Sequence, residues 1–578
     1  MKNEDLAREA KSLVSEDRLS SDLEALCQWE RFSGTEGEWE AARFIQRRLG
    51  EDGIPVTLHK FESYISLPQK AELEELQPEK KTIPCITHSF GGSTDSSGVE
   101  GEAVLVDKEG NSERPLEKKV AFVDGMMSPG SFSKKLELQG AIAQVYANIG
   151  DILHDYIVSD VWGTPTPETA KHLPRTPLVS ITRSAANPLI NSIRQGRNVR
   201  LRLRTQVDTR WRPVEMPEAV VRAEGERSES DDTREFVLIH GHLDSWYTGA
   251  MDNASGDVLI MELARIFHKL RARLRRDVRF AFWIGHSHGR YSGSTWYADQ
   301  FWELLKEGCV ANLNVDQVGF RDSHIFRTVA TADIAKWVLD SIRTEASQDV
   351  PPLPVVRYSD MSFWGLGIPS FSLRTILLPE SKDWPPHRPE DGLAWYLHTP
   401  EDTPDKIDRK LLAEHVGVHA AAVSDLLSCP FLPLNPVALG EKILSELEDI
   451  GGEGGSDLYL GPPMEAAARF LSVAKVLQDR ITAGGDIDAA QTKIVNRSLL
   501  WISQRLNCVS LTVAGPYHQD PAVMTALPLL PALQPARNLG NEEEPGFLHA
   551  LLLRERNRLV DALREAEDIA KRTVSLIA

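Results

Sequence analysis

The stretch that most constrains the fold runs from residue 235 to residue 319, where short apolar runs alternate with loops and a helical pattern. Residues 235–240, 278–284 and 311–315 are β-branched and apolar runs, which are typical of buried strands. Between the first two, residues 259–270 carry leucine, isoleucine and phenylalanine at helical spacing. Strands that alternate with helices predict a mainly parallel sheet with helices on its faces.

Residue types that bind metals follow these strands at their carboxyl ends. They are His242, Asp252, His286, His288 and Asp316. In open α/β sheets, ligands bind in the crevice outside the carboxyl ends of the strands. Both position and composition therefore predict a metal site at this edge of the sheet.

Length, charge and cysteine usage limit the classes of protein to consider. A chain of 578 residues predicts several domains, and a net charge of −19 argues against binding to nucleic acid or to anionic membranes. We find no apolar run long enough to span a bilayer, and the charged start of the chain does not resemble a signal peptide. Five widely separated cysteines indicate reduced thiols, so we expect a cytoplasmic protein.

Changes in residue pattern along the chain predict three domains. Residues 1–65 and 213–430 form the main α/β domain, and residues 66–212, with short strands and many turns, form a β-rich insert. Residues 431–578 contain four helical patterns with broad apolar stripes, which predict a bundle. Such stripes are too broad for a single surface layer, so we expect a homodimer formed through this region.

Five motifs then occur in a fixed order. They are His242-x-Asp244, Asp252-Asn-Ala-Ser-Gly, Leu313-Asn-Val-Asp316-Gln-Val-Gly, Ser359-Asp360 through Gly367-Ile-Pro, and His398-Thr-Pro-Glu-Asp-Thr-Pro-Asp. In this order the main domain resembles the co-catalytic zinc aminopeptidases and glutamate carboxypeptidases, including the transferrin-receptor branch. The insert looks like the protease-associated domain of the larger members, and the C-terminal region looks like their helical dimerisation domain.

The resemblance implies a role for each motif residue. His242 and Asp316 would bind one metal ion, His398 the other, and Asp252 would bridge the two. Asp244 would orient the imidazole of His242 rather than bind metal. Imidazole and carboxylate ligands suit zinc, as one or two ions, although another divalent metal is possible.

One motif departs from the family. The family carries an adjacent Glu-Glu pair, in which the first is the general base and the second a metal ligand, whereas this chain reads His286-Ser287-His288. Counting forward from Trp283 puts His286 in the base position, and counting back from Gly293 puts His288 in the ligand position. We therefore expect His286 to act as the base and His288 to bind metal.

These residues favour a metal-dependent hydrolase that acts on an amide or peptide bond of a small, acidic or modified substrate. Arg290, Tyr291 and Arg357 lie near the candidate loops and are predicted to contact that substrate. Two alternatives stay open: a metalloenzyme of another class, such as a lyase or hydratase, and a non-catalytic dimeric binding protein.

Overall fold

A single sheet runs through two parts of the molecule. The computed structural model describes residues 4–126, 130, 132–224, 235–353, 355–385, 392–452, 457–483, 487–538 and 545–577. Within them, an 11-stranded sheet has the order β13-β10-β8-β9-β7-β3-β4-β5-β6, and β1 and β2 pair off this path. Its strands are β1 (Val56–Gln77), β2 (Lys81–Ile83), β3 (Val99–Val106), β4 (Val120–Asp124), β5 (Ala143–Ala147), β6 (Leu178–Ile181), β7 (Arg200–Val221), β8 (Phe236–His242), β9 (Asp277–Trp283), β10 (Cys309–Asn314) and β13 (Ser370–Ser372).

The part of the sheet that carries the predicted site is parallel. β13, β10, β8 and β9 all run in the same direction, as the sequence predicts, and β7 joins β9 antiparallel. Alternate residues of β8 face opposite layers, because side chains alternate across a strand. Val237 and Ile239 join the core under the N-terminal helices, whereas Phe236 and Leu238 pack with residues of the opposite layer.

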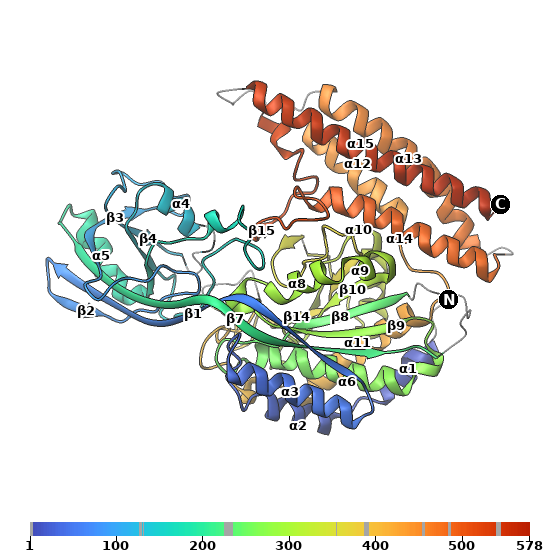
Figure 1. The fold of residues 1–578 in the computed structure, drawn as a ribbon, viewed down its shortest axis with the longest axis horizontal. Coiled ribbons are helices and arrows are strands. Elements are labelled where there is room, and N and C mark those ends of the chain that lie inside the picture. Colours follow the sequence, from blue (N-terminus) through green and yellow to red (C-terminus); the bar gives the residue numbers. More distant parts are fainter. Residues whose placement is uncertain are drawn as a thin grey trace.

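Helices cover both faces of this parallel part (Figure 1). One layer contains α1 (Glu4–Ser12), α2 (Glu16–Leu26), α3 (Glu36–Glu51), α6 (Ser255–Lys269) and α11 (Arg409–Ser428). The other contains α8 (Ser292–Gln300) and α9 (Trp302–Gly308), and α10 (Ala332–Ala346) packs near the β13 edge. The mixed, mainly parallel sheet between helices confirms the predicted fold class.

Two long strands carry the sheet into the insert. β1 and β7 pair antiparallel along most of their length, and beyond β7 the strands β3, β4, β5 and β6 run parallel to one another. The helices α4 (Phe132–Leu138) and α5 (Arg183–Arg194) belong to this insert. The boundaries predicted at 65/66 and 212/213 fall inside β1 and β7, because each strand belongs to both parts of the sheet.

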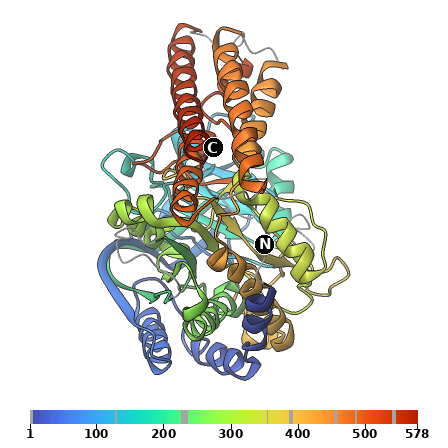
Figure 2. The ribbon, with the colours of Figure 1, turned by 90° about the vertical axis from the view of Figure 1, so that its right-hand side faces the viewer.

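The C-terminal region consists mainly of four helices that stand to one side of the sheet (Figures 1 and 2). They are α12 (Pro436–Gly452), α13 (Asp457–Ala483), α14 (Ala489–Leu511) and α15 (Pro545–Leu576). Two short strand pairs complete the described fold: β11 (Ile325–Arg327) with β14 (Arg374–Ile376), and β12 (Val356–Arg357) with β15 (Val523–Ala526). Among the described helices, none is both long and apolar enough to cross a membrane.

Candidate metal centre

Three predicted ligands meet at the carboxyl edge of the parallel strands. His242 is the last residue of β8, Asp316 follows β10, and Asp252 lies in the turn Ala250–Ala254 that leads into α6. One ligand atom from each of the three lies within 4.8 Å of the others. The structure thus brings together residues that are up to 74 positions apart in the chain.

The hydrogen bond of His242 determines which ring nitrogen faces this cluster. His242 Nδ1 lies 2.8 Å from the main-chain carbonyl oxygen of Asp244, and a carbonyl can only accept. Nδ1 therefore carries a proton, and Nε2 points at Asp252 Oδ1, 3.0 Å away, and Asp316 Oδ1, 3.7 Å away. A ring nitrogen that faces two carboxylate oxygens either carries a proton or shares a cation with them.

The electrostatics of the cluster fit a divalent metal ion. Burial disfavours a charged imidazole, but Asp252 and Asp316 outweigh it and raise the pKa of His242 well above its ordinary value. Asp316 Oδ1 is buried without a hydrogen-bond partner in the described structure. Donor atoms around a tetrahedral zinc ion with bonds of about 2.0 Å lie about 3.3 Å apart, close to the observed spacings. His242, Asp252 and Asp316 are therefore suitable ligands for zinc.

The other oxygen of Asp252 faces His398, as the resemblance implies for a bridging carboxylate. His398 Nε2 lies 2.9 Å from Asp252 Oδ2, and His398 Nδ1 lies 2.8 Å from the main-chain oxygen of Asp155. The Asp155 amide in turn donates to the His398 carbonyl at 3.1 Å. Tyr247 Oη donates to the Asp155 carboxylate at 2.7 Å, and burial raises the pKa of Asp155 to about 6.

Asp155 belongs to the insert, and the sequence contained no signal for its role. Its contacts with His398 use main-chain atoms, which any residue type could supply. Tyr156 adds a ring contact to His398, with centroids 5.4 Å apart. The insert therefore holds one of the predicted metal ligands.

His288 is not one of the three residues of this cluster, and its role as a metal ligand stays a prediction. Its Nδ1 lies 3.0 Å from Ser33 Oγ, and its ring packs against Trp246 with centroids 4.2 Å apart. Its Nε2 is buried without a hydrogen-bond partner. His286 and His288 lie on the one-turn helix α7 (His286–Gly289). Residues two apart on a helix point about 200° apart, so the two rings take different directions from α7.

His286 lies beside the cluster. Its ring stacks on the ring of His242, with centroids 3.8 Å apart and planes inclined by 13°. Its Nδ1 lies 2.8 Å from Asp360 Oδ2, and no partner of its Nε2 is found among the described residues. Gly285 makes this turn possible, because its φ of +66° is left-handed and a Cβ there would collide with Ser292.

Asp244 orients His242, as the resemblance implies, but it does so through its main-chain oxygen rather than its carboxylate. The carboxylate instead accepts from the backbone amides of His286 and Ser287, at 3.0 and 2.7 Å, and from Ser33 Oγ at 2.8 Å. Asp244 thus fixes both α7 and the tautomer of His242.

Asp402 has a role that the sequence analysis missed. Its carboxylate is buried and accepts from the backbone amides of Met251 and Asp252, at 2.8 and 3.1 Å. Burial raises the pKa of Asp402 to about 7. Asp402 lies four residues after His398 in the same motif, and this position was the signal in the sequence that could have pointed to it.

The three predicted substrate-binding residues lie in different surroundings. Tyr291 forms an edge contact with His286, with centroids 5.0 Å apart, and packs on Trp162 of the insert. Arg290 is 7% exposed and donates through Nε to the main-chain oxygen of Ser159 at 2.8 Å. Arg357 requires a correction: it donates to the Leu511 carbonyl at 2.6 Å and pairs with Asp520 at 3.3 Å, so it serves the contact with the C-terminal region.

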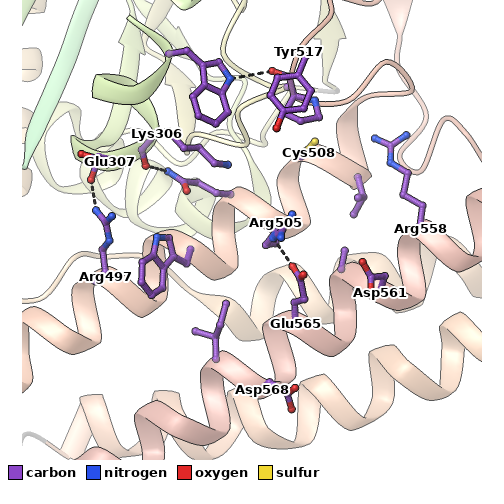
Figure 3. Close-up of a pocket in the computed structure, with 18 of the residues that line it drawn as sticks. Lys306, Glu307, Arg497, Arg505, Cys508, Tyr517, Arg558, Asp561, Glu565 and Asp568 are labelled. Atoms are coloured by element: carbon purple, nitrogen blue, oxygen red, sulfur yellow. Dashed lines mark hydrogen bonds and ion pairs between the residues drawn. The ribbon is translucent and has the colours of Figure 1, made fainter.

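A separate cavity of about 690 Å³ lies away from this cluster, where α9 meets α14 and α15 (Figure 3). Trp302, Trp501 and Tyr517 line it, and Arg505 pairs with Glu565 across it at 2.5 Å. It contains none of the predicted metal ligands.

Comparison with known proteins agrees with this geometry. Residues 220–423 match the sequence profile of Peptidase family M28. Aminopeptidase NAALADL1 of Rattus norvegicus is 27% identical over 305 residues, which cover 46% of this chain and 41% of that protein. Carboxypeptidase Q of Xenopus laevis is 24% identical over 372 residues, which cover 59% of this chain and 74% of that protein. The matched region thus spans less than half of the first relative.

A solved structure supports the fold. A zinc aminopeptidase from Bacillus subtilis superposes with a TM-score of 0.55 at 18% identity, and the match covers 72% of this chain and 96% of that one. The sequence matches agree with the family resemblance that the five motifs predicted, and this structure confirms the fold.

Proposed function

We propose that this chain, whose residues 220–423 match Peptidase family M28, is a metal-dependent hydrolase of amide or peptide bonds. The observation that carries the proposal is the His242, Asp252 and Asp316 cluster, in which an imidazole nitrogen faces two carboxylate oxygens. Both relatives named above are peptidases by name, which supports the same reaction class.

We further propose that the protein binds one zinc ion tightly. Three protein ligands with an open fourth position are the usual set of a catalytic zinc site, and His242, Asp252 and Asp316 supply them. Among the contacts of the described residues, His398 is the one imidazole found at the opposite oxygen of Asp252, and His288 packs against Trp246. When bound, the ion would polarise the substrate carbonyl and acidify a water molecule.

His286 takes the place of the family glutamate as the proton carrier in this proposal. Its Nε2 accepts a proton from the water molecule that adds to the amide carbonyl carbon. The same proton passes to the amine nitrogen as the C–N bond breaks, so a carboxylic acid and an amine are released. The stacking of His286 on His242 supports this role, because it holds the imidazole beside the cluster.

An acidic substrate is favoured by Arg290. Its guanidinium has no carboxylate within ion-pair distance in the described structure, although the residue is largely buried. Arginine binds carboxylates through paired hydrogen bonds, and the next residue, Tyr291, contacts His286. We therefore propose that Arg290 binds a carboxylate of the substrate.

The zinc-loaded protein should be tested on two peptide sets. One set has free N-termini and blocked C-termini, and the other has blocked N-termini and free C-termini. Mass spectrometry of released amino acids separates an aminopeptidase from a carboxypeptidase, and chelator-treated protein is the control. Protein that retains zinc but releases nothing from either set would contradict the hydrolase and favour a lyase or a binding protein.

We also propose that the chain forms a homodimer through residues 431–578. Trp501 and Tyr517 are 43% and 73% exposed beside the cavity of Figure 3. Five basic and four acidic residues line that cavity, so the same surface on a second copy can be complementary in charge. Light scattering should give the mass of two chains for the native protein and the mass of one chain for Trp501→Lys. The cytoplasmic location and the protease-associated identity of the insert stay predictions.

A further inference from the structure

We infer that Asp360 is a positioning residue that holds His286 in the tautomer needed to accept a proton at Nε2. The inference rests on the proposed role of His286 and extends it to a second residue. Asp360 is fully buried, and its Oδ2 lies 2.8 Å from His286 Nδ1. In space it lies directly beside the imidazole of His286.

The two oxygens of Asp360 have different partners, and this defines the direction of the contact. Ser294 Oγ donates to Oδ1 at 2.8 Å, so Oδ2 is left for His286. An ionised carboxylate can only accept, so the proton between Oδ2 and the ring belongs to Nδ1. In a neutral imidazole the other nitrogen, Nε2, then carries the lone pair that a proton acceptor requires.

The surroundings hold the ring in this orientation. The His286 amide donates to Asp244 Oδ1 at 3.0 Å, and the ring is stacked on His242 at 3.8 Å. Ser294 is itself linked to Ser362 Oγ at 2.8 Å, and Trp162 Nε1 of the insert donates to Ser362 at 2.9 Å. Asp360 is thus the charged end of a buried hydrogen-bond network that begins in the insert.

A purely structural role would not need a carboxylate at this position. Burying an ionised group is costly unless it is well paired, and here its described partners are one imidazole and one hydroxyl. An asparagine could satisfy Ser294 with its oxygen, but its amide nitrogen would then donate to His286 Nδ1. That arrangement moves the ring proton to Nε2 and removes the acceptor.

The test is an NMR measurement of the His286 tautomer in full-length, zinc-loaded protein labelled with ¹⁵N-histidine. Spectra recorded at about pH 8.5, above the ordinary range of imidazole, report the neutral ring. Loss of one signal in His286→Gln assigns the residue. We expect protonated Nδ1 in the native protein and protonated Nε2 in Asp360→Asn. Native protein with Nε2 protonated would overturn the inference without any variant.

Metal content and turnover separate positioning from general damage. Asp360→Asn should keep its zinc, and its kcat on a peptide found in the two sets should fall about 10²–10⁴-fold with little change in KM. The matched control is Ser362→Ala, which alters the same network without touching His286 and should keep the native tautomer. Native kcat in Asp360→Asn would contradict the inference. Native turnover in His286→Ala would instead contradict the proposed role of His286 as the base. The tautomer measurement would still decide whether Asp360 orients the ring.

Discussion

The two oxygens of the Asp252 carboxylate face different environments. On the Oδ1 side, His242 and Asp316 project from the ends of neighbouring parallel strands, and three ligands converge. On the Oδ2 side, His398 comes from a loop and is held by the main chain of Asp155 in the insert. Strand ends fix a ligand more rigidly than a loop does. The difference suggests that tight metal binding belongs to the first side, whereas the second depends on how the insert is seated.

Removal of the shared carboxylate should have the largest effect. Asp252→Ala deletes one of three ligands on the first side and the partner of His398 on the second. We expect elemental analysis to show a fall from about one zinc per chain to less than about 0.1. The matched control is Asp405→Ala, which changes a side chain that is 68% exposed and should keep the native zinc content. Full zinc content in Asp252→Ala would refute the assigned cluster.

The two sides should then differ when each loses its own ligand. Asp316→Ala should lose most of its zinc, because two ligands hold the ion poorly, whereas His398→Ala should keep more than about half. Zinc measured after dialysis at equal protein concentration gives the comparison. Equal losses in the two variants, or two tightly bound ions in the native protein, would show that the sides are equivalent.

His288→Ala should leave zinc content unchanged and lower the free energy of unfolding by about 2 kcal/mol. The reason is that His288 packs against Trp246 and Phe32 rather than against the cluster, so its loss leaves a cavity. Chemical denaturation and elemental analysis of the same sample measure both quantities. Loss of one zinc equivalent in this variant would show that His288 is a metal ligand.

The smallest effect is expected where the insert meets the second side. Tyr247→Phe removes the hydroxyl that donates to the Asp155 carboxylate, which should cost about 1 kcal/mol. Amide hydrogen exchange should rise near Asp155 and His398 while zinc content stays constant. Unchanged exchange would mean that this hydrogen bond does not help to seat the insert.

The sequence predicted the first side better than the second. Strand periodicity together with ligand residues at strand ends located His242 and Asp316, because both signals are local in the chain. The part played by Asp155 could not be predicted, since a main-chain oxygen leaves no trace in residue type. Arg357 was misplaced because nearness to Ser359-Asp360 in sequence does not indicate the direction of a side chain.

The histidine pair shows the same limit at a smaller scale. Counting along the motif put His286 in the base position and His288 in the ligand position, but the two counts disagree by one residue and do not establish which ring faces the cluster. The choice depends on the phase of a single helical turn, which in this chain is set by Gly285 and by the amides that bind Asp244. Sequence spacing does not contain that phase.

The β1–β7 ribbon has a consequence for how the molecule unfolds. Each strand is 22 residues long and is hydrogen-bonded in both the main domain and the insert. Fraying at one end of the ribbon removes pairing that the other end uses to fix its register. We therefore expect these two parts to melt together, in one calorimetric transition, and an excised insert to lose two of its strands at once. The inserted segment is in this sense a continuation of the main domain's sheet, and we expect it not to fold apart from that sheet.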